Sequence, residues 1–237
     1  MNSVLITGAA RRGGAAIARR VHQRGHHLVL HCRASSLADA QALMDELNGL
    51  RAGSASVWVA ELCGEIAAPP GAERMIGLVA CASRYVDSGL DDVDAELEAD
   101  LQAHLNGHLA LVRHCRAGLT AHGGAIVAIT DIAVERATAG YFSYQIAKGA
   151  LAAAVRALAI ELAPAVRVNA VAPGPLEWPL GHEVPAARKA QILRTTPLGR
   201  IGSFDELARA VDFLLFDATF TTGSTLQVDG GRSHFLE

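Results

Sequence analysis

The sequence has few aromatic residues, few charged residues and no long basic run. Phe, Trp and Tyr make up only 5% of its 237 residues, so a buried core must be built mainly from Ala, Val, Leu and Ile. Such a core is typical of parallel strands that helices cover on both faces. Charged residues make up 19% and the formal net charge is −3, which argues against nucleic acid as a partner.

The sequence shows no cysteine pairs with ligand spacing, and we expect neither a targeting signal nor a membrane span. Cys32, Cys63, Cys81 and Cys115 show neither CxxC nor Cys/His ligand spacing, so we expect reduced thiols and no metal site. The first residues, MNSVLITG, contain no basic leader and no long apolar region, which predicts no signal peptide. Since no apolar stretch reaches the ~18 residues of a membrane span, we expect a soluble, cytoplasmic protein without a membrane partner.

Short apolar runs alternate along the chain with Ala-rich amphipathic segments of helical length. This rhythm predicts the α/β class, with one Rossmann-like doubly wound parallel sheet, helices on both faces, and a single domain over residues 1–237. The expected strands are Val4–Ile6, Leu28–His31, Val57–Val59, Leu78–Ala80, Ala125–Ile129, Val166–Ala170 and Thr225–Val228. The expected helices are Ala15–Arg24, Ala38–Leu47, Asp94–Leu119, Tyr144–Leu162 and Asp205–Phe216.

The crossover between the expected third and fourth strands is shortened. The segment Ala60–Gly77 contains two adjacent prolines, Pro69 and Pro70, followed by Gly71, which leaves little room for a full helix. We therefore expect an irregular crossover here, with one face of the sheet thinly covered or covered by a partner subunit.

The first strand runs into the glycine-rich segment TGAARRGG at residues 7–14, and a helix follows. Gly8 allows a tight turn after the strand, and Gly14 lets the helix lie close to the sheet. The helix N-terminus then presents free backbone N–H groups to a pyrophosphate. A plain strand-to-helix turn uses the same glycines, so the segment indicates a dinucleotide site only together with other features.

Residues at the end of the second strand indicate whether the chain binds NADH or NADPH. An acidic residue usually binds the ribose hydroxyls of NADH there, but this chain has Arg33, Ser35 and Ser36 instead. A guanidinium can bind a phosphate through two hydrogen bonds, and the serines can donate more. The sequence therefore predicts NADPH; the alternative is that Arg33 is a solvated surface charge.

Tyr144 and Lys148 are spaced to lie on the same face of a helix, one turn apart. A nearby ammonium should lower the phenol's pKa from about 10 and make the phenol a better acid and base. Lys148 can also hold the nicotinamide ribose. The pair stands 13 residues after Asp131 at a strand end, which favours an active site over an ordinary helix-surface pair.

With these motifs the chain resembles the short-chain dehydrogenase/reductase family over essentially its whole length. Ordinary members have a glycine where this chain has Arg12, and a serine where it has Asp131. Both differences are similar to pteridine reductases. The segments ITDIAVERATAGYFSYQIAKGAL and VDGGRSH resemble those of bacterial dihydromonapterin reductases.

The resemblance implies roles for individual residues. Asn106 would hold a water that links to Lys148, Tyr85 would stack on a pterin, and Arg12 would reach the cofactor phosphates and the substrate ring. The implied catalytic residues are Asp131, Tyr144, Lys148 and Asn106. The implied cofactor contacts are Gly8, Arg12, Gly14, Arg33, Ser35, Ser36, Glu61, Ser83, Lys148, Pro173 and Gly174. The implied substrate contacts are Arg12, Ser83, Tyr85, Asp131, Tyr144 and Trp178.

Several positions depart from the family pattern. The two asparagines that usually brace the cofactor loop after the fourth strand are replaced by Ala80 and Cys81, which predicts weaker cofactor binding or a less rigid loop. Glu61 replaces an aspartate, and Trp178 stands where many members have a threonine. Asp131 in place of serine suggests a proton relay through Tyr144 to the nitrogen of a C=N bond.

These features favour NADPH-dependent reduction of a dihydropterin, such as dihydromonapterin or dihydrobiopterin, to the tetrahydropterin. The alternatives are a carbonyl or imine reductase of secondary metabolism and a non-catalytic NADPH-binding sensor. A loop at about residues 175–200 is expected to close over the substrate. His104 and His108, four apart on a helix, are expected at the helix surface or in a subunit contact. The resemblance also implies a homotetramer.

Overall fold

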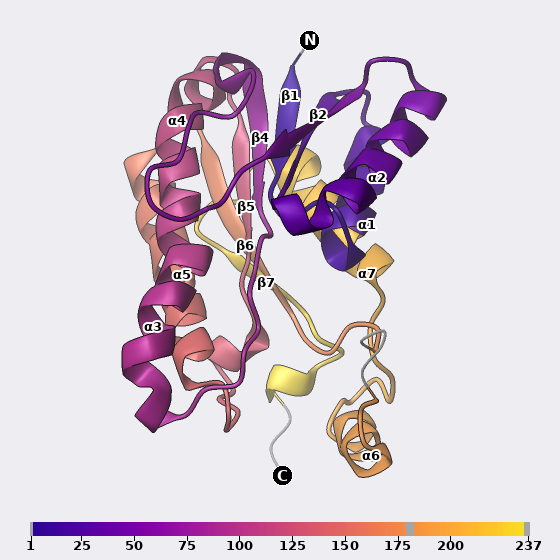
Figure 1. Ribbon diagram of the computed structural model, residues 1–237, viewed down its shortest axis with the longest axis vertical. Helices are drawn as coiled ribbons and strands as arrows, with labels where there is room; N and C mark the ends of the chain where they lie inside the picture. The colour runs from indigo at the N-terminus through magenta and orange to yellow at the C-terminus, as the bar shows by residue number, and fades with distance from the viewer. Residues whose placement is uncertain (1, 179–182, 235–237) are drawn as a thin grey trace.

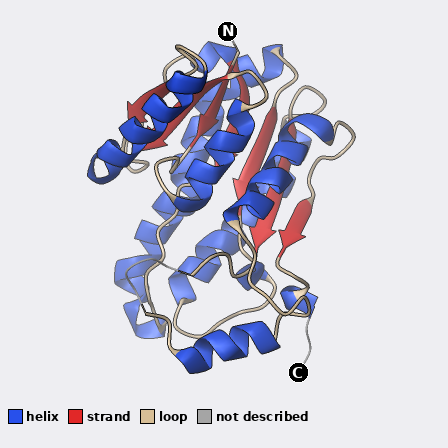
Figure 2. Cartoon of the chain, turned by 90° about the vertical axis from the view of Figure 1, so that its right-hand side faces the viewer, coloured by secondary structure: helices blue, strands red, loops and turns tan. Residues whose placement is uncertain are grey.

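The computed structural model describes residues 2–178 and 183–234, and its centre is one parallel sheet of seven strands (Figures 1 and 2). The strands lie in the order β3-β2-β1-β4-β5-β6-β7, so the chain reverses its direction of travel between β1 and β4. This order confirms the doubly wound fold, and all seven expected strands are present. They are β1 (Ser3–Ile6), β2 (His27–Cys32), β3 (Ala55–Val59), β4 (Met75–Ala80), β5 (Ala125–Ile129), β6 (Arg167–Pro173) and β7 (Thr225–Val228).

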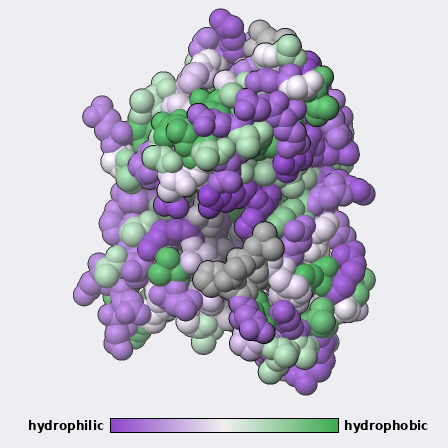
Figure 3. Space-filling model, turned by 45° about the vertical axis from the view of Figure 1, so that its right-hand side comes forward, coloured by the Kyte–Doolittle hydropathy of each residue, from purple (hydrophilic) through white to green (hydrophobic). Residues whose placement is uncertain are grey.

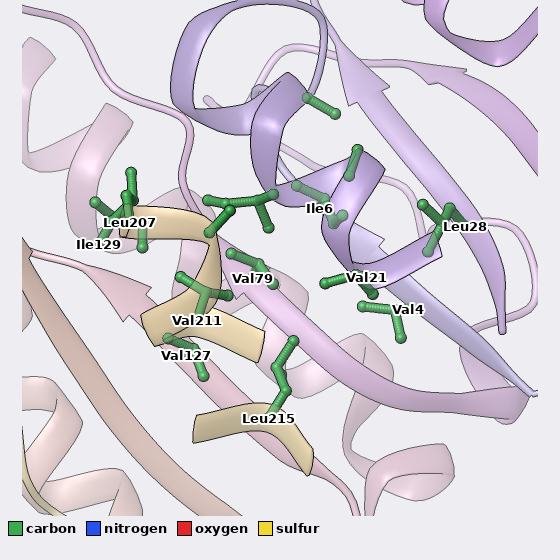
Figure 4. Close-up of a cluster of buried hydrophobic side chains, with 14 of the residues drawn as sticks. Val4, Ile6, Val21, Leu28, Val79, Val127, Ile129, Leu207, Val211 and Leu215 are labelled. Atoms are coloured by element: carbon green, nitrogen blue, oxygen red, sulfur yellow. The ribbon is translucent and has the colours of Figure 1, made fainter. Parts of the chain in front are cut away.

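Helices cover both faces of the sheet (Figure 1). On one face lie α1 (Arg12–His22), α2 (Leu37–Leu50) and α7 (Phe204–Asp212); on the other lie α3 (Val93–Leu101), α4 (Gly107–Ala121) and α5 (Phe142–Glu161). Successive strand residues point to opposite faces. Val4 and Ile6 of β1 therefore pack with α1 and α7 (Figure 4), whereas Leu5 packs in the second core under α4 and α5. The central strands β1, β4 and β5 are buried on both faces because each face has its own layer of helices.

The crossover from β3 to β4 contains no α-helix, as its prolines predict. Its only helical turn is the short 3-10 segment Ala72–Arg74, and β4 begins at Met75, three residues before the expected start. Leu62 and Ile66 of this crossover are 8% exposed and belong to the core on the α4–α5 face. The crossover therefore covers part of the sheet, whereas the edge strand β3 is only partly buried, with Val59 44% exposed.

The long helix expected over Asp94–Leu119 is interrupted. A single π-helical turn, Gln102–Asn106, separates α3 from α4. A π turn contains more residues than an α turn, so every later residue is rotated relative to an uninterrupted α-helix. Such turns are frequent at functional sites, and this one lies beside α5.

Within the segment expected as a substrate loop, the structure places a helix, α6 (Ala186–Arg194), that the sequence analysis did not anticipate. Figure 1 shows α6 at the lower end of the molecule, away from the sheet. Residues 179–182 of the same segment lie outside the described residues. Among the described helices, none is both long and apolar enough to span a bilayer.

Candidate active site

Two cavities open at the carboxyl ends of the central strands, beside the switch point between β1 and β4, where doubly wound sheets bind ligands. The first, of about 510 Å³, is lined by Gly8, Arg33 and residues after β3 and β4; we term it the Arg33 cavity. The second, of about 490 Å³, is lined by Tyr144, Asp131 and residues after β6; we term it the Tyr144 cavity. Ser83 lines both and marks their junction.

Two of the predicted glycines are required by the backbone. Gly8 has φ +63°, and a Cβ there would lie 2.9 Å from the Cα of Ala82. A Cβ on Gly14 would lie 2.1 Å from the carbonyl oxygen of Gly8. Any residue other than glycine would clash there. The start of α1 can therefore approach the end of β1 closely enough for its N–H groups to face a pyrophosphate. Both roles expected for Gly8 and Gly14 agree with this geometry.

The Arg33 cavity collects most of the residues expected to bind the cofactor. Its lining includes Arg33, Ser35, Ser36 and Glu61. Arg33 is exposed, and its carbonyl accepts hydrogen bonds from the N–H and Oγ of Ser36, at 3.0 and 3.2 Å. These residues fit a nucleotide with a 2′-phosphate, because a guanidinium and two hydroxyl-bearing residues line the same cavity and the end of β2 adds no acidic residue to it.

Arg11 also lines the Arg33 cavity, although the sequence analysis did not single it out. Its guanidinium forms an ion pair with Asp39 of α2. The only signal for Arg11 in the sequence was its place next to Arg12 in the glycine-rich segment. The contact between Arg11 and Asp39 depends on how α2 packs, which the sequence does not show.

The loop after β4 is braced, although it lacks the asparagines typical of the family. The Oγ1 of Thr7 accepts hydrogen bonds from the N–H groups of Cys81 and Ala82, at 2.8 and 2.9 Å. Behind Thr7, the buried ring of His108 lies 3.1 Å away through Nε2, and its Nδ1 donates to the carbonyl of His104. Burial lowers the pKa of His108 to about 4, so the ring is neutral and can accept from Thr7. Thr7, backed by His108, therefore holds this loop where the asparagine side chains are missing.

A second buried histidine holds the glycine turn. The N–H of Gly8 donates to Nδ1 of His31 at 3.1 Å, so Nε2 carries the ring proton and donates to the carbonyl of Ala60 at 3.1 Å. Burial lowers the pKa of His31 to about 4. The neutral ring thus ties the turn after β1 to the crossover after β3.

Asp131, Tyr144 and Lys148 meet at the floor of the Tyr144 cavity. Asp131 follows β5, and its Oδ1 accepts from the N–H of Ala133 at 2.7 Å, which fixes the carboxylate. The Tyr144 hydroxyl on α5 donates to Oδ2 of Asp131 at 2.7 Å. One turn along α5, the Lys148 ammonium donates to the carbonyl of Ile129 at 2.8 Å and lies 5.6 Å from the Tyr144 ring centre.

The electrostatics of this group differ from the sequence-based expectation. Burial and the Asp131 carboxylate raise the pKa of Tyr144 well above its usual value. Lys148 therefore does not produce the low phenol pKa that we expected, because the hydroxyl faces an anion. Burial lowers the pKa of Lys148 to about 8, although the Asp131 carboxylate opposes that shift. Tyr144 thus stays protonated at neutral pH and is arranged to donate a proton.

Aromatic rings line the wall above Tyr144. Tyr85 is 62% exposed and stacks on Tyr141, with ring centres 4.3 Å apart, while its edge approaches Tyr144 at 4.9 Å. Tyr141 was not predicted, and its place three residues before Tyr144 was the only signal in the sequence. One face of Tyr85 is therefore taken by Tyr141, and its exposed surface can contact a flat ligand ring.

Arg12 lies on the substrate side of the junction. It lines the Tyr144 cavity with Pro173 and Gly174, and it is not among the lining residues of the Arg33 cavity. Its guanidinium donates to the carbonyl of Glu177 at 3.2 Å and lies 4.8 Å from the ring centre of Phe204. These contacts hold the loop after β6 against the start of α7.

Trp178 does not line either cavity. Its half-buried ring lies 5.6 Å from the ammonium of Lys189 on α6. Trp178 therefore lies against α6 and apart from the lining of the Tyr144 cavity, and the substrate contact that the resemblance implies for it stays a prediction.

Asn106 is likewise absent from the site, and His104 takes the place expected for it. The Asn106 side chain is exposed, whereas His104 is fully buried with its ring edge-on to Tyr144, 5.3 Å between centres. Two residues along a helix correspond to a rotation of about 200°, so the two side chains cannot share a face. The role that the family resemblance implied for Asn106 does not fit this structure, because the Asn106 side chain is exposed and the π turn places His104 beside Tyr144.

His104, which we expected at the helix surface or in a subunit contact, is buried and is held by polar neighbours. Its Nε2 donates to the carbonyl of Arg84 at 3.0 Å, and the Arg84 guanidinium donates to the fully buried Asp100 at 3.1 Å. Burial lowers the pKa of His104 to about 3, so the ring is neutral. The spacing of four between Asp100 and His104 was the available signal.

We predict that His104→Ala lowers kcat by up to about 100-fold, because Tyr144 loses the ring that positions it. Asn106→Ala, the matched control on the same π turn, should leave kcat unchanged. His104→Gln, which keeps a donor for the Arg84 carbonyl, should restore part of the loss. Steady-state kinetics and a thermal melt on each variant test this; equal loss in the two alanine variants would contradict it.

The known proteins that this chain is similar to are named as reductases or oxidoreductases. The sequence model of a family described as Enoyl-(Acyl carrier protein) reductase matches residues 8–233. The uncharacterized oxidoreductase YmfI of Bacillus subtilis is 33% identical over 97% of this chain and 98% of its own length. The 3-oxoacyl-[acyl-carrier-protein] reductase FabG of Aggregatibacter actinomycetemcomitans is 30% identical, covering 97% and 98%. The crystal structure of FolM alternative dihydrofolate reductase 1 from Brucella canis, complexed with NADP, superposes with a TM-score of 0.88, 30% identity and coverage of 100% and 96%.

Proposed function

The chain belongs to the short-chain dehydrogenase/reductase family, and on that premise we propose that it reduces a dihydropterin-type ring to the tetrahydro form. It is an oxidoreductase, and NADPH is its cofactor. The observation that carries the proposal is the pairing of Tyr144 with Asp131 at 2.7 Å, inside a cavity that also holds Arg12 and Tyr85. The likeness to FolM alternative dihydrofolate reductase 1 supports it.

The proposed proton donor is Tyr144. Reduction of a C=N bond forms one C–H and one N–H bond, so the site must deliver one hydride and one proton. When bound, NADPH supplies the hydride. Tyr144, which stays protonated, gives its proton to the ring nitrogen, and the Asp131 carboxylate orients the hydroxyl.

Lys148 and His104 assist the proposed proton transfer from Tyr144. The Lys148 ammonium is anchored on the Ile129 carbonyl and supplies positive charge beside the phenolate that forms when Tyr144 gives up its proton. His104 holds the Tyr144 ring edge-on. In this proposal Asp131, Tyr144 and Lys148 are the catalytic residues, and His104 is a positioning residue.

The rest of the chain completes the proposed site. Gly8, Gly14, Arg33, Ser35 and Ser36 would hold the nucleotide in the Arg33 cavity. The segment at about 175–200, which includes α6, would close over the ring. All of these elements belong to the single domain proposed for residues 1–237.

Pairing of subunits through α5 is part of the proposal. Phe142, Ile146 and Ile160 of α5 are 38%, 40% and 80% exposed, which is unusual for large apolar side chains on one helix. The family resemblance implies a homotetramer, and these side chains supply an apolar surface for such contacts.

A carbonyl reductase is the second candidate, because FabG and several other relatives are named as reductases or dehydrogenases of carbonyl or hydroxyl compounds. The Asp131 carboxylate disfavours it. An ordinary serine donates a hydrogen bond to a carbonyl oxygen, whereas a carboxylate repels the negative charge that develops there.

The proposal is tested by following NADPH oxidation with dihydropterins, dihydrofolate and simple ketones in parallel. We expect turnover of at least one dihydropterin-type compound and little turnover of ketones. Ketone turnover with inactive pterins would support the carbonyl reductase instead. NADPH binding without turnover of any compound in the panel would support the sensor and contradict the proposal.

A further inference from the structure

The interior behind Tyr144 contains a carboxylate that has no role in the proposed proton transfer. Hydrophilic side chains border the hollow on the face of the molecule that Figure 3 shows, where they contact water. Asp100 of α3 is instead fully buried, with an exposed fraction of 0%. An aspartate is almost never fully buried unless it is paired, and Asp100 is paired through only one of its two oxygens.

The two oxygens of Asp100 have different surroundings. Oδ1 accepts a hydrogen bond from the Arg84 guanidinium at 3.1 Å and lies 3.9 Å from Nε2 of His104. Oδ2 is buried and has no hydrogen-bond partner among the described residues. In the low dielectric of a protein interior, a charge that is only partly compensated acts strongly on the groups around it. The negative charge of Asp100 therefore influences its neighbours more than a surface carboxylate would.

A chain of contacts leads from Asp100 to Tyr144. The Arg84 guanidinium binds Asp100, while the Arg84 carbonyl accepts from Nε2 of His104 at 3.0 Å. The His104 ring stands edge-on to the Tyr144 ring, with 5.3 Å between their centres. Arg84 also donates to Glu96, one turn before Asp100 on α3, at 2.6 Å. The guanidinium thus fixes the loop after β4 to α3, and with it the carbonyl that holds His104.

Asp100 is also one of two anions that act on Lys148. Titratable side chains face the ammonium from each neighbouring element: Asp131 after β5, Cys81 after β4, Tyr144 on α5, Asp100 on α3, His104 in the π turn and His108 on α4. Burial lowers the pKa of His104 and His108 to about 3 and about 4, and raises the pKa of Cys81 to about 11. These three groups are therefore neutral at neutral pH, which leaves the carboxylates of Asp131 and Asp100.

We propose that Asp100 is a positioning residue of the active site, which holds His104 against Tyr144 through Arg84 and, together with Asp131, keeps the Lys148 ammonium charged. The inference rests on the roles proposed for Tyr144 and Lys148, but not on the identity of the reduced ring. The Asp100 charge raises the pKa of Lys148 against the effect of burial, and it also raises the pKa of Tyr144. Asp100 thus favours the state in which both groups hold their protons.

Stability alone does not explain a charged side chain at this position. Burial raises the pKa of Asp100, although Arg84 opposes that shift, so the charged carboxylate is less favourable here than in water. Replacing a buried ion pair by neutral groups is often neutral or stabilising. Arg84 would also keep Glu96 as a partner. Perturbed carboxylates of this kind are concentrated at functional sites.

The test measures the titration of Lys148 directly in Asp100→Asn, which removes the charge and keeps the shape. The lysines of the chain are Lys148 and Lys189, so NMR of protein labelled with ¹³C at the lysine Cε gives two signals, and Lys189→Ala assigns them. We expect the Lys148 midpoint at about 8 in the parent protein. In Asp100→Asn it should move by about half a pH unit to lower pH, while the Lys189 signal stays unchanged.

Glu96→Gln is the matched control, because it removes the other carboxylate that binds Arg84 from the same helix. Glu96 has a side chain that is 26% exposed, and the charges that raise the pKa of Lys148 are those of Asp131, Cys81 and Asp100. This variant should leave the Lys148 titration and kcat unchanged. An equal shift in both variants would assign the effect to the geometry of Arg84 and overturn the inference.

Kinetics and thermal melts separate a role in the active site from a structural one. With any compound of the panel that is turned over, Asp100→Asn should lower kcat at pH 8 about threefold, because less ammonium remains and His104 is held less firmly. Its thermal midpoint should be unchanged or higher. An unchanged Lys148 titration, whatever the midpoint, would overturn the inference.

The Lys148 titration requires no substrate, so it separates this inference from the proposed function. A shifted midpoint in Asp100→Asn supports the inference even if ketones are reduced and pterins are not. Asp100→Leu, which replaces the carboxylate by an apolar group of similar size, serves for the same titration if the asparagine variant does not fold. Dihydropterin turnover with an unshifted Lys148 midpoint leaves the proposed function standing and contradicts the role of Asp100.

Discussion

Tyr144→Phe is expected to lower kcat by about 10²- to 10⁴-fold, the usual contribution of a positioned acid. The change removes only the hydroxyl that donates to Asp131. The ring remains, and with it the edge contacts to Tyr85 and His104. NADPH binding should therefore persist while turnover is lost, which a cofactor titration and single-turnover kinetics measure separately.

Tyr141→Phe is the control for that experiment. Tyr141 lines the same cavity and stacks on Tyr85, but the hydrogen bond to Asp131 comes from Tyr144. Most of kcat should survive in this variant. If Tyr144→Phe kept more than about a tenth of kcat, another group would have to deliver the proton.

Asp131→Asn is expected to lower kcat/KM for the dihydropterin by about 10²-fold and to change the pH profile. Asparagine is nearly the same size and can still accept from the N–H of Ala133, so the change chiefly removes charge. Burial lowers the pKa of Lys148 to about 8, and the Asp131 carboxylate keeps this pKa from falling further. Without the carboxylate this pKa falls, so the ammonium is lost at lower pH, and the alkaline limb of kcat/KM should move below pH 8.

Asp131→Ser separates the relay from simple orientation of Tyr144. Serine restores the residue found in ordinary members of the family, which suits donation to a carbonyl oxygen. We expect it to reduce pterin turnover and to favour ketones relative to the parent protein. Unchanged pterin turnover in this variant would show that no relay through Asp131 is needed.

The residues at strand ends could be predicted because their positions depend on local structure. Parallel strands place their carboxyl ends at one edge, so residues directly after β1, β4, β5 and β6 converge there. Gly8, Ser83, Asp131 and Gly174 all lie at that edge, as the strand assignments predict. The spacing of Tyr144 and Lys148 on one helix is equally local, and so is the absence of an α-helix from the crossover between β3 and β4.

Two expectations that came from the family resemblance do not fit the structure. The resemblance selects Asn106, but the π turn at Gln102–Asn106 places His104 beside Tyr144 instead. The cofactor loop is braced from Thr7 and His108, which are 101 residues apart in sequence. No local pattern could show that these side chains meet, because packing of α4 against the sheet brings them together.

The sequence by itself determined the class of fold, the cofactor turn and the Tyr144–Lys148 pair, since these follow from hydrophobic periodicity, glycine geometry and residue spacing. Only the tertiary structure decided the pKa values of the site residues and the charge of the cavity. Burial beside Asp131 made Tyr144 a group that keeps its proton, and docking of α6 set Arg188 in the same wall as Arg136 and Arg232. The pKa of a side chain and the charge of a cavity depend on neighbours from distant parts of the chain, which spacing along the sequence does not reveal.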